Sequence, residues 1–245
     1  TMKEDRYVVS SDAGNTAWAG LALLAAHRRF RADRPRAHHY LVAALRGAVW
    51  IETRCRSAGR YGGYSGGSEG WEQTAENHKC PVKLLWRSTE HNLDIYAFFW
   101  QLADALAAAK GPFPKVEATF TAPQPWRARA DHALGFVLAM YQPREKCFRI
   151  GVRDEAGTIN LDITASDAQT WSLLALGHLP AFRARLGWAG PPAPPPTLAW
   201  VEANCRVTVP GHAGYRFSDK GSGIWPEGSG HLAAAYRYLN EKDPR

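Results

Sequence analysis

The chain of 245 residues is 45% hydrophobic, so it can enclose a sizeable core in one large domain or two small ones. Its net charge of +7 would suit a nucleic acid, but the Lys and Arg residues are scattered over expected helix faces and no nucleic-acid motif accompanies them. The longest apolar runs are shorter than a membrane span. We therefore expect a globular protein that neither binds nucleic acid nor spans a membrane.

Helical patterns recur along the chain. A polar cluster leads directly into an apolar segment, where Ser88 can cap the helix while Glu90 falls in its first turn. Asn15, and either Ser166 or Asp167, can cap two further helices. The predicted helices cover residues 16–27, 38–52, 89–109, 125–140, 168–176, 198–205 and 231–239.

Two segments interrupt the helices. Residues 147–152 and 158–163 flank a turn, which predicts a short β-hairpin. Residues 60–71 are rich in glycine and present Tyr64 and Trp71. We interpret them either as an aromatic loop beside a substrate cleft or as an ordinary surface loop, with equal weight.

The predicted helices alternate between enclosed and amphipathic. Helical hairpins with inner and outer members build an α/α toroid, in which the inner helices run parallel. A polar cluster precedes each inner helix, so the clusters would meet at one mouth. They contain Asp12 and Asn15, residues 88–94, Asp167 and Gln169, and Glu227. We therefore predict an all-α fold, an α/α toroid with a short β-hairpin, as a single domain over residues 1–245.

Three motifs resemble a family of bacterial secreted proteins, often described only by a Tat signal, whose (α/α)6 toroid is similar to that of glycoside hydrolases. The motifs are Ser88-Thr89-Glu90-His91-Asn92-Leu93-Asp94-Ile95-Tyr96, Asp167-Ala168-Gln169-Thr170-Trp171 and Gly223-Ile224-Trp225-Pro226-Glu227-Gly228-Ser229. The resemblance implies a site for a carbohydrate polymer in a secreted or periplasmic protein. Seven helices fall short of twelve, so we expect a contracted toroid, or one completed by a missing N-terminal portion or a partner chain.

Glycoside hydrolysis needs a carboxylic acid that protonates the leaving oxygen and a carboxylate that acts as base or nucleophile. Glu227 adjoins Trp225 and suits the acid, because apolar surroundings raise a carboxyl pKa. Glu90 or Asp12 suits the base, because a helix N-terminus favours an ionised carboxylate. Glu227 also lies near a helix start, so the two effects oppose each other and the assignment of roles stays open.

Other polar and aromatic residues are candidates for contact with sugar. Ten tryptophans exceed what a core of this size needs, and indole rings stack on sugar faces. Core or capping roles are alternatives for the polar members of the set, most of all for Asp167. The predicted substrate-binding residues are His91, Asn92, Asp94, Asp167, Trp171, Trp225, Tyr64 and Trp71.

Two other functions remain open. A polysaccharide lyase acting on an acidic polymer would need a Tyr or His base and a neutralising Arg or Asn, for which His91, Asn92, Arg87 and Tyr96 are available. A noncatalytic glycan-binding protein of an exopolysaccharide assembly system would keep the aromatic residues without needing two opposed carboxylates.

The cysteine count is even, and Cys55 and Cys80 bracket the glycine-rich segment. This arrangement favours a loop-closing disulfide in an oxidising compartment. His78 lies beside Cys80 but no further ligands have metal-site spacing, so we predict no metal and no cofactor. The chain starts Thr1-Met2-Lys3, so we expect the natural N-terminus and its targeting signal to be missing.

Overall fold

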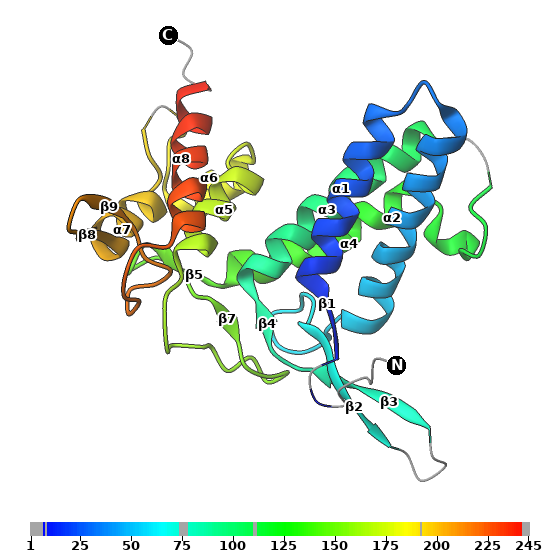
Figure 1. Cartoon of the computed structure of the whole chain (residues 1–245), viewed down its shortest axis with the longest axis horizontal. Helices are drawn as coiled ribbons and strands as arrows, with labels where there is room; N and C mark the ends of the chain where they lie inside the picture. Colours follow the sequence, from blue (N-terminus) through cyan, green and yellow to red (C-terminus); the bar gives the residue numbers. More distant parts are fainter. Residues whose placement is uncertain (1–6, 8, 74–77, 110–111, 192, 242–245) are drawn as a thin grey trace. The chain divides into compact units, whose positions relative to one another are not determined.

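Figure 1 shows the computed structural model, which describes residues 7, 9–73, 78–109, 112–191 and 193–241. These described residues form a mixed α/β structure, with 54% helix, 16% strand, 8 helices and several small antiparallel sheets. The prediction of an all-α toroid is therefore wrong. Part of its error lies in residues 60–71, which were interpreted as a loop but whose last residues belong to the paired strand Gly67–Gln73.

The chain divides into two compact units, each described here by itself. The first consists of residues 1–135 and 153–157, and the second of residues 136–152 and 158–245. The single domain expected over residues 1–245 stays a prediction. None of the helices in the described ranges combines the length and apolar character needed to cross a membrane.

The first unit contains a bundle of helices and a three-stranded sheet. The strands are antiparallel in the order β1-β2-β3, and β2 carries a bulge between Ser68 and Trp71. Helix α1 packs on α2 and α3 (Figure 1). The elements are β1 (Ser10–Asp12), α1 (Ala13–Arg29), α2 (Arg34–Cys55), β2 (Gly67–Gln73), β3 (Lys79–Leu84), β4 (Arg87–Ser88), α3 (Thr89–Ala108), the short 3-10 helix Ala118–Phe120, and α4 (Pro123–Ala139), which continues into the second unit.

The second unit contains shorter helices and two small hairpins. Strand β5 pairs with β6 through Tyr141 and Phe148, and Val152 forms an antiparallel bridge with Ile159. The hairpin predicted between residues 147–152 and 158–163 is therefore confirmed at this bridge and at the bond from the Asn160 N–H to Gly151 O, whereas residues 147–148 pair with β5 instead. The elements are β5 (Tyr141–Gln142), β6 (Cys147–Phe148), β7 (Gly151–Val152), α5 (Ser166–Leu176), α6 (Pro180–Leu186), α7 (Pro196–Cys205), β8 (Arg206–Val209), β9 (His212–Tyr215) and α8 (Pro226–Glu241).

The helix starts agree only in part with the predicted caps. Ser88 caps α3 by accepting from the backbone N–H of His91, and Glu90 lies in the first turn, as predicted. Helix α1 begins earlier, because Asp12 rather than Asn15 is its N-cap. Helix α5 begins at Ser166 without a side-chain cap, so the capping role predicted for Ser166 or Asp167 is wrong.

The predicted disulfide is also wrong. Cys55 is buried at the end of α2, Cys80 is exposed on β3, and all four thiols are free. Backbone hydrogen bonds, rather than a disulfide, attach the glycine-rich segment to its surroundings. The Ser65 N–H donates to Cys55 O at 2.7 Å, and the Gly66 N–H donates to Trp86 O at 2.9 Å.

A buried arginine attaches residues 153–157 to the first unit. The Arg87 guanidinium is 0% exposed and donates to Ser57 Oγ at 2.6 Å and to Asp154 O at 2.8 Å. Ser57 Oγ in turn donates to Glu155 Oε2 at 2.5 Å. This network gives the two terminal nitrogens of a buried cation backbone and side-chain acceptors, which stabilise its charge.

Two glycines in neighbouring helices predict opposite effects on stability. A Cβ at Gly20 in α1 would lie 2.2 Å from the Phe98 ring, whereas a Cβ at Gly47 in α2 would meet only Thr16 Cγ2 at 3.5 Å. Gly20→Ala should therefore lower the free energy of unfolding by about 1–3 kcal/mol through overpacking. Gly47→Ala should raise it by about 0.5–1 kcal/mol, because glycine is unfavourable inside a helix. Urea unfolding followed by circular dichroism measures both, and equal effects would contradict the close approach of α1 to α3.

Candidate functional site

Three predicted residues meet where α1 and α3 begin. The His91 Nε2 atom lies 3.4 Å from Glu90 Oε2 and 3.9 Å from Asp12 Oδ1. The two carboxylate oxygens are therefore no farther apart than the ~6.5–9.5 Å that inverting glycosidases require. The three side chains are partly exposed, with 16% exposure for His91, 24% for Asp12 and 26% for Glu90. Two carboxylates and an imidazole thus share one solvent-accessible site.

The His91 ring is held in place by close contacts on two sides. A Cβ at Gly14 would lie 2.6 Å from its Cδ2 atom, so only glycine leaves room for the ring beside α1. The Trp86 indole lies on another side, with ring centroids 5.3 Å apart. The His91 Nδ1 atom is buried and has no hydrogen-bond partner in the described part of the chain. Contacts of this kind fix the ring and leave Nε2 directed at the carboxylates.

Asp12, unlike Glu90, also caps a helix. Its Oδ1 atom accepts from the backbone N–H of Asn15 at 2.8 Å as the N-cap of α1. A carboxylate that accepts from a backbone N–H at a helix N-terminus is stabilised as the anion. Glu90 lies in the first turn of α3 but receives no backbone hydrogen bond from any described residue.

Other members of the same motif belong to the interior. Asn92 is 0% exposed, and its amide pairs with the Tyr64 backbone by accepting from the N–H at 2.8 Å and donating to the carbonyl at 3.0 Å. Tyr64 is also 0% exposed, and its hydroxyl donates to Glu52 at 2.7 Å. Asp94 is 5% exposed. A sugar cannot reach these side chains, so Asn92, Asp94 and Tyr64 are corrected from substrate contacts to structural residues.

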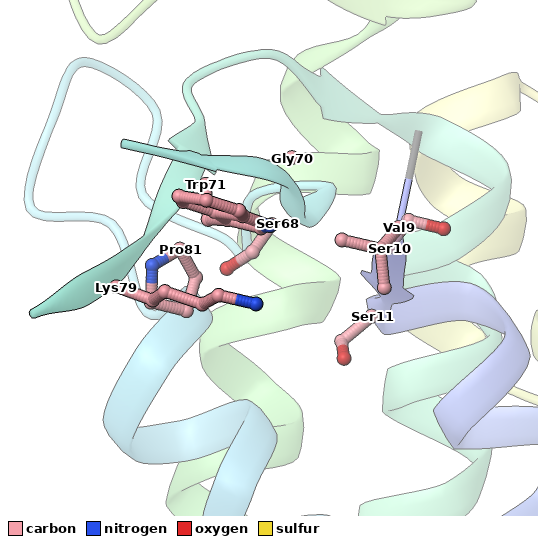
Figure 2. A pocket seen from close by; sticks show the side chains of 8 residues that line it. All are labelled: Val9, Ser10, Ser11, Ser68, Gly70, Trp71, Lys79 and Pro81. Carbon is pink, nitrogen blue, oxygen red and sulfur yellow. The ribbon is translucent and has the colours of Figure 1, made fainter. Parts of the chain in front are cut away.

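Trp71, by contrast, lines a pocket on the sheet. The pocket has a volume of about 200 Å³ and is lined by all three strands, with Val9 and Ser10 facing Trp71 and Lys79 across it (Figure 2). The Lys79 Nζ atom lies 4.4 Å from the centroid of the Trp71 indole. Ser11, which lines the same pocket, directly precedes Asp12.

A larger pocket adjoins this one. Its volume is about 500 Å³, and it shares Ser11, Ser68 and Pro81 with the first pocket. The end of α2 and strand β3 contribute its other lining residues, which are Trp50, Thr53, Arg54 and Lys83. The two pockets therefore adjoin each other and are together called here the sheet pocket, which is lined by indole rings and cationic side chains.

The remaining candidates lie in the second unit. The Glu227 carboxylate is 68% exposed and lies 3.6 Å from His231 Nε2. The His231 ring contacts the indoles of Trp171 and Trp225, with centroid distances of 4.4 and 5.5 Å. Glu227, Trp171 and Trp225 thus form an aromatic and acidic cluster around His231. Asp167 lies in the first turn of α5, where its Oδ1 accepts from the Ala168 N–H.

The lyase residues are largely inaccessible. Arg87 and Asn92 are 0% exposed and Tyr96 is 2% exposed, which leaves His91 as the accessible member of that set. Burial also raises the pKa of the Tyr96 hydroxyl, which disfavours the phenolate that a lyase base would need. Within the described ranges, no group of three or more His, Cys, Asp or Glu residues is arranged to hold a metal ion.

The residues missed by the sequence interpretation are Trp50, Arg54 and Lys83 in the sheet pocket, Trp86 beside His91, and His231 in the second unit. Arg54 and Lys83 looked like ordinary surface cations. Only the pairing of β1, β2 and β3 beside the end of α2 brings them together. His231 had a local signal, because it follows Glu227 by one helical turn.

The comparisons with known proteins give no match. No family model, no curated protein and no solved structure is significantly similar to the chain. The resemblance to toroidal glycoside hydrolases therefore stays a prediction that depends on the three motifs alone.

Three of the four thiols should be unreactive at neutral pH. Burial raises the pKa of Cys55 and of Cys205 to about 12, and that of Cys147 to about 11. Since only the thiolate attacks alkylating reagents, we expect iodoacetamide at pH 7.5 to modify exposed Cys80 alone. Mass spectrometry of the native protein should find one modified site, and urea-unfolded protein should show four. Rapid native labelling of Cys55 would contradict its enclosure.

The same shifts predict a loss of stability in alkali. An unfolded thiol ionises near pH 9, whereas folded Cys55 holds its proton until about pH 12, so the unfolded state binds fewer protons between these values. The contribution is complete below pH 9 and declines as the pH rises toward 12. Urea midpoints measured between pH 8 and 11 should fall, and Cys55→Ser should flatten part of that fall.

Proposed function

We propose that the protein binds a carbohydrate polymer and hydrolyses its glycosidic bonds at the site formed by Asp12, Glu90 and His91. The observation that carries this proposal is the pair of carboxylates whose oxygens lie 3.4 and 3.9 Å from His91 Nε2. The indole of Trp86 beside this site offers an apolar face for a sugar ring. A secreted or periplasmic location, implied by the resemblance, is part of the proposal.

The surroundings of each carboxylate support its role. Asp12 accepts a backbone N–H, so it acts as the base and takes a proton from the attacking water. Glu90 supplies the proton to the glycosidic oxygen as the bond from that oxygen to the anomeric carbon breaks, and the water oxygen forms the new bond to the anomeric carbon. His91 lies between both oxygens and orients them. Glu227, which the sequence analysis predicted as the catalytic acid, lies in the second unit, and its catalytic role stays a prediction.

Amide substitutions test these roles with little change in shape. Glu90→Gln and Asp12→Asn should each lower kcat by about 10²–10⁴-fold, because each removes one proton-transfer group. Asp12→Asn should leave stability nearly unchanged, since Asn is an equally good N-cap. Release of reducing ends from a panel of neutral and acidic polysaccharides is the measurement.

Glu117→Gln is the matched control. Glu117 is an exposed acid ahead of the 3-10 helix and makes no side-chain cap, so its substitution should leave turnover intact. Unchanged turnover in both Glu90→Gln and Asp12→Asn would overturn the proposed catalytic pair. Binding of a saccharide with no reducing ends released would instead favour a noncatalytic glycan-binding protein. A product that absorbs ultraviolet light would indicate a lyase.

A further inference from the structure

The sheet pocket carries charges that the proposed hydrolysis does not use. Arg54 lines the larger pocket, is exposed, and has no ion pair with any described residue. Lys83 lines the same pocket and lies 3.8 Å from Glu155 Oε1, with 42% of its side chain exposed. Lys79 lines the smaller pocket. Arg54, Lys79 and Lys83 therefore line the sheet pocket, and Lys83 also lies near the Glu155 carboxylate.

Aromatic and hydroxyl groups accompany these charges. The half-buried indoles of Trp50 and Trp71 line the larger and the smaller pocket respectively. Ser11 and Ser68 line both pockets, and Thr53 lines the larger one. Indole faces pack on sugar rings, hydroxyls bond to sugar hydroxyls, and guanidinium groups bind carboxylates in a bidentate manner. A ligand that uses all three kinds of contact is a saccharide with carboxylate groups.

We propose that the sheet pocket binds the acidic sugar units of a uronate-containing polysaccharide, with Arg54 as the main carboxylate contact and Trp50 and Trp71 as stacking surfaces. The two adjoining volumes of about 200 and 500 Å³ suit consecutive sugar units rather than one small molecule. Ser11 lines both pockets and is followed in β1 by Asp12, so the pocket lies beside the strand that carries one of the proposed catalytic residues. This inference rests on the proposed function, because it takes the ligand to be that enzyme's substrate.

Calorimetric titration with tetragalacturonate tests the inference, using its fully methyl-esterified form as a neutral ligand with the same skeleton. The titrations use the full chain carrying Glu90→Gln, so that binding is measured without turnover. The acid should bind at least about tenfold more tightly than the ester, because each carboxylate gains a charge-assisted hydrogen bond. Its affinity should fall as salt rises from 20 to 500 mM, through charge screening.

Two substitutions locate the contact. Arg54→Gln should weaken binding of the acid by about tenfold and leave binding of the ester unchanged. Arg34→Gln removes the same charge from the exposed start of α2 and should change neither. If Arg54→Gln fails to fold, Lys83→Gln and the salt titration of the parent protein give the same comparison.

The outcomes separate this inference from the proposed hydrolysis. Equal affinity for acid and ester, or an Arg54→Gln protein that binds the acid normally, would overturn the inference even if a neutral polysaccharide is hydrolysed. If binding depends on charge and is weakened by Arg54→Gln, but the parent protein releases no product, the uronate-binding pocket would be supported and the proposed hydrolase activity would be overturned. If neither ligand binds, the inference that the sheet pocket binds uronates would be overturned, and the proposed hydrolysis would not be affected.

Discussion

The site in the first unit depends on the pairing of one buried amide with one backbone residue. Asn92 is fully enclosed and bonds to both the N–H and the carbonyl of Tyr64. This pairing fixes the segment that follows, in which Gly66 accepts from the Ala13 N–H at 2.9 Å and donates to Trp86 O at 2.9 Å. The starts of α1 and α3 are therefore bonded to one segment, and that segment sets the distance between Asp12 and His91. Removing the amide would leave two buried backbone groups unsatisfied, which costs more than the bonds themselves contribute.

A second buried amide has the same role in the other unit. Gln169 is the fourth residue of α5, as Asn92 is the fourth residue of α3. It accepts from the Phe148 N–H at 2.7 Å and donates to the Phe148 carbonyl at 2.9 Å, and it also donates to the carbonyl four residues earlier, as Asn92 does. A polar residue ahead of an apolar helix can therefore serve to attach a neighbouring backbone segment. The recurrence of polar clusters along the chain is explained in part by this structural need, without reference to chemistry.

The sequence predicted correctly those features that depend on neighbouring residues in the chain, and it was misleading for features that depend on contacts between distant segments. The cap at Ser88 and the first-turn position of Glu90 follow from side-chain reach alone, and both were predicted correctly. The strands β2 and β3 were missed because their stability comes from pairing, including the close contact of Gly67 with β1, rather than from β propensity. The sequence also could not predict which site residues are exposed to solvent. Glu90 and Asn92 lie two positions apart in one motif, yet Glu90 is partly exposed and Asn92 is buried in the core.

In the proposed complex, the charges of the first unit would let an acidic ligand bind beside the carboxylates of Asp12 and Glu90. These two acids, at the starts of α1 and α3, would by themselves repel a uronate polymer. The sheet pocket offsets that repulsion at neighbouring sugar units, because Arg54 and Lys83 supply positive charge beside β1. The ligand carboxylates would then be repelled by Asp12 and Glu90 and attracted by Arg54. Both effects would oppose a shift of the polysaccharide by one sugar unit, because that shift would move a ligand carboxylate away from Arg54 and toward Asp12. In the proposed complex, charge would therefore select the register that places a glycosidic bond between the carboxylates of Asp12 and Glu90.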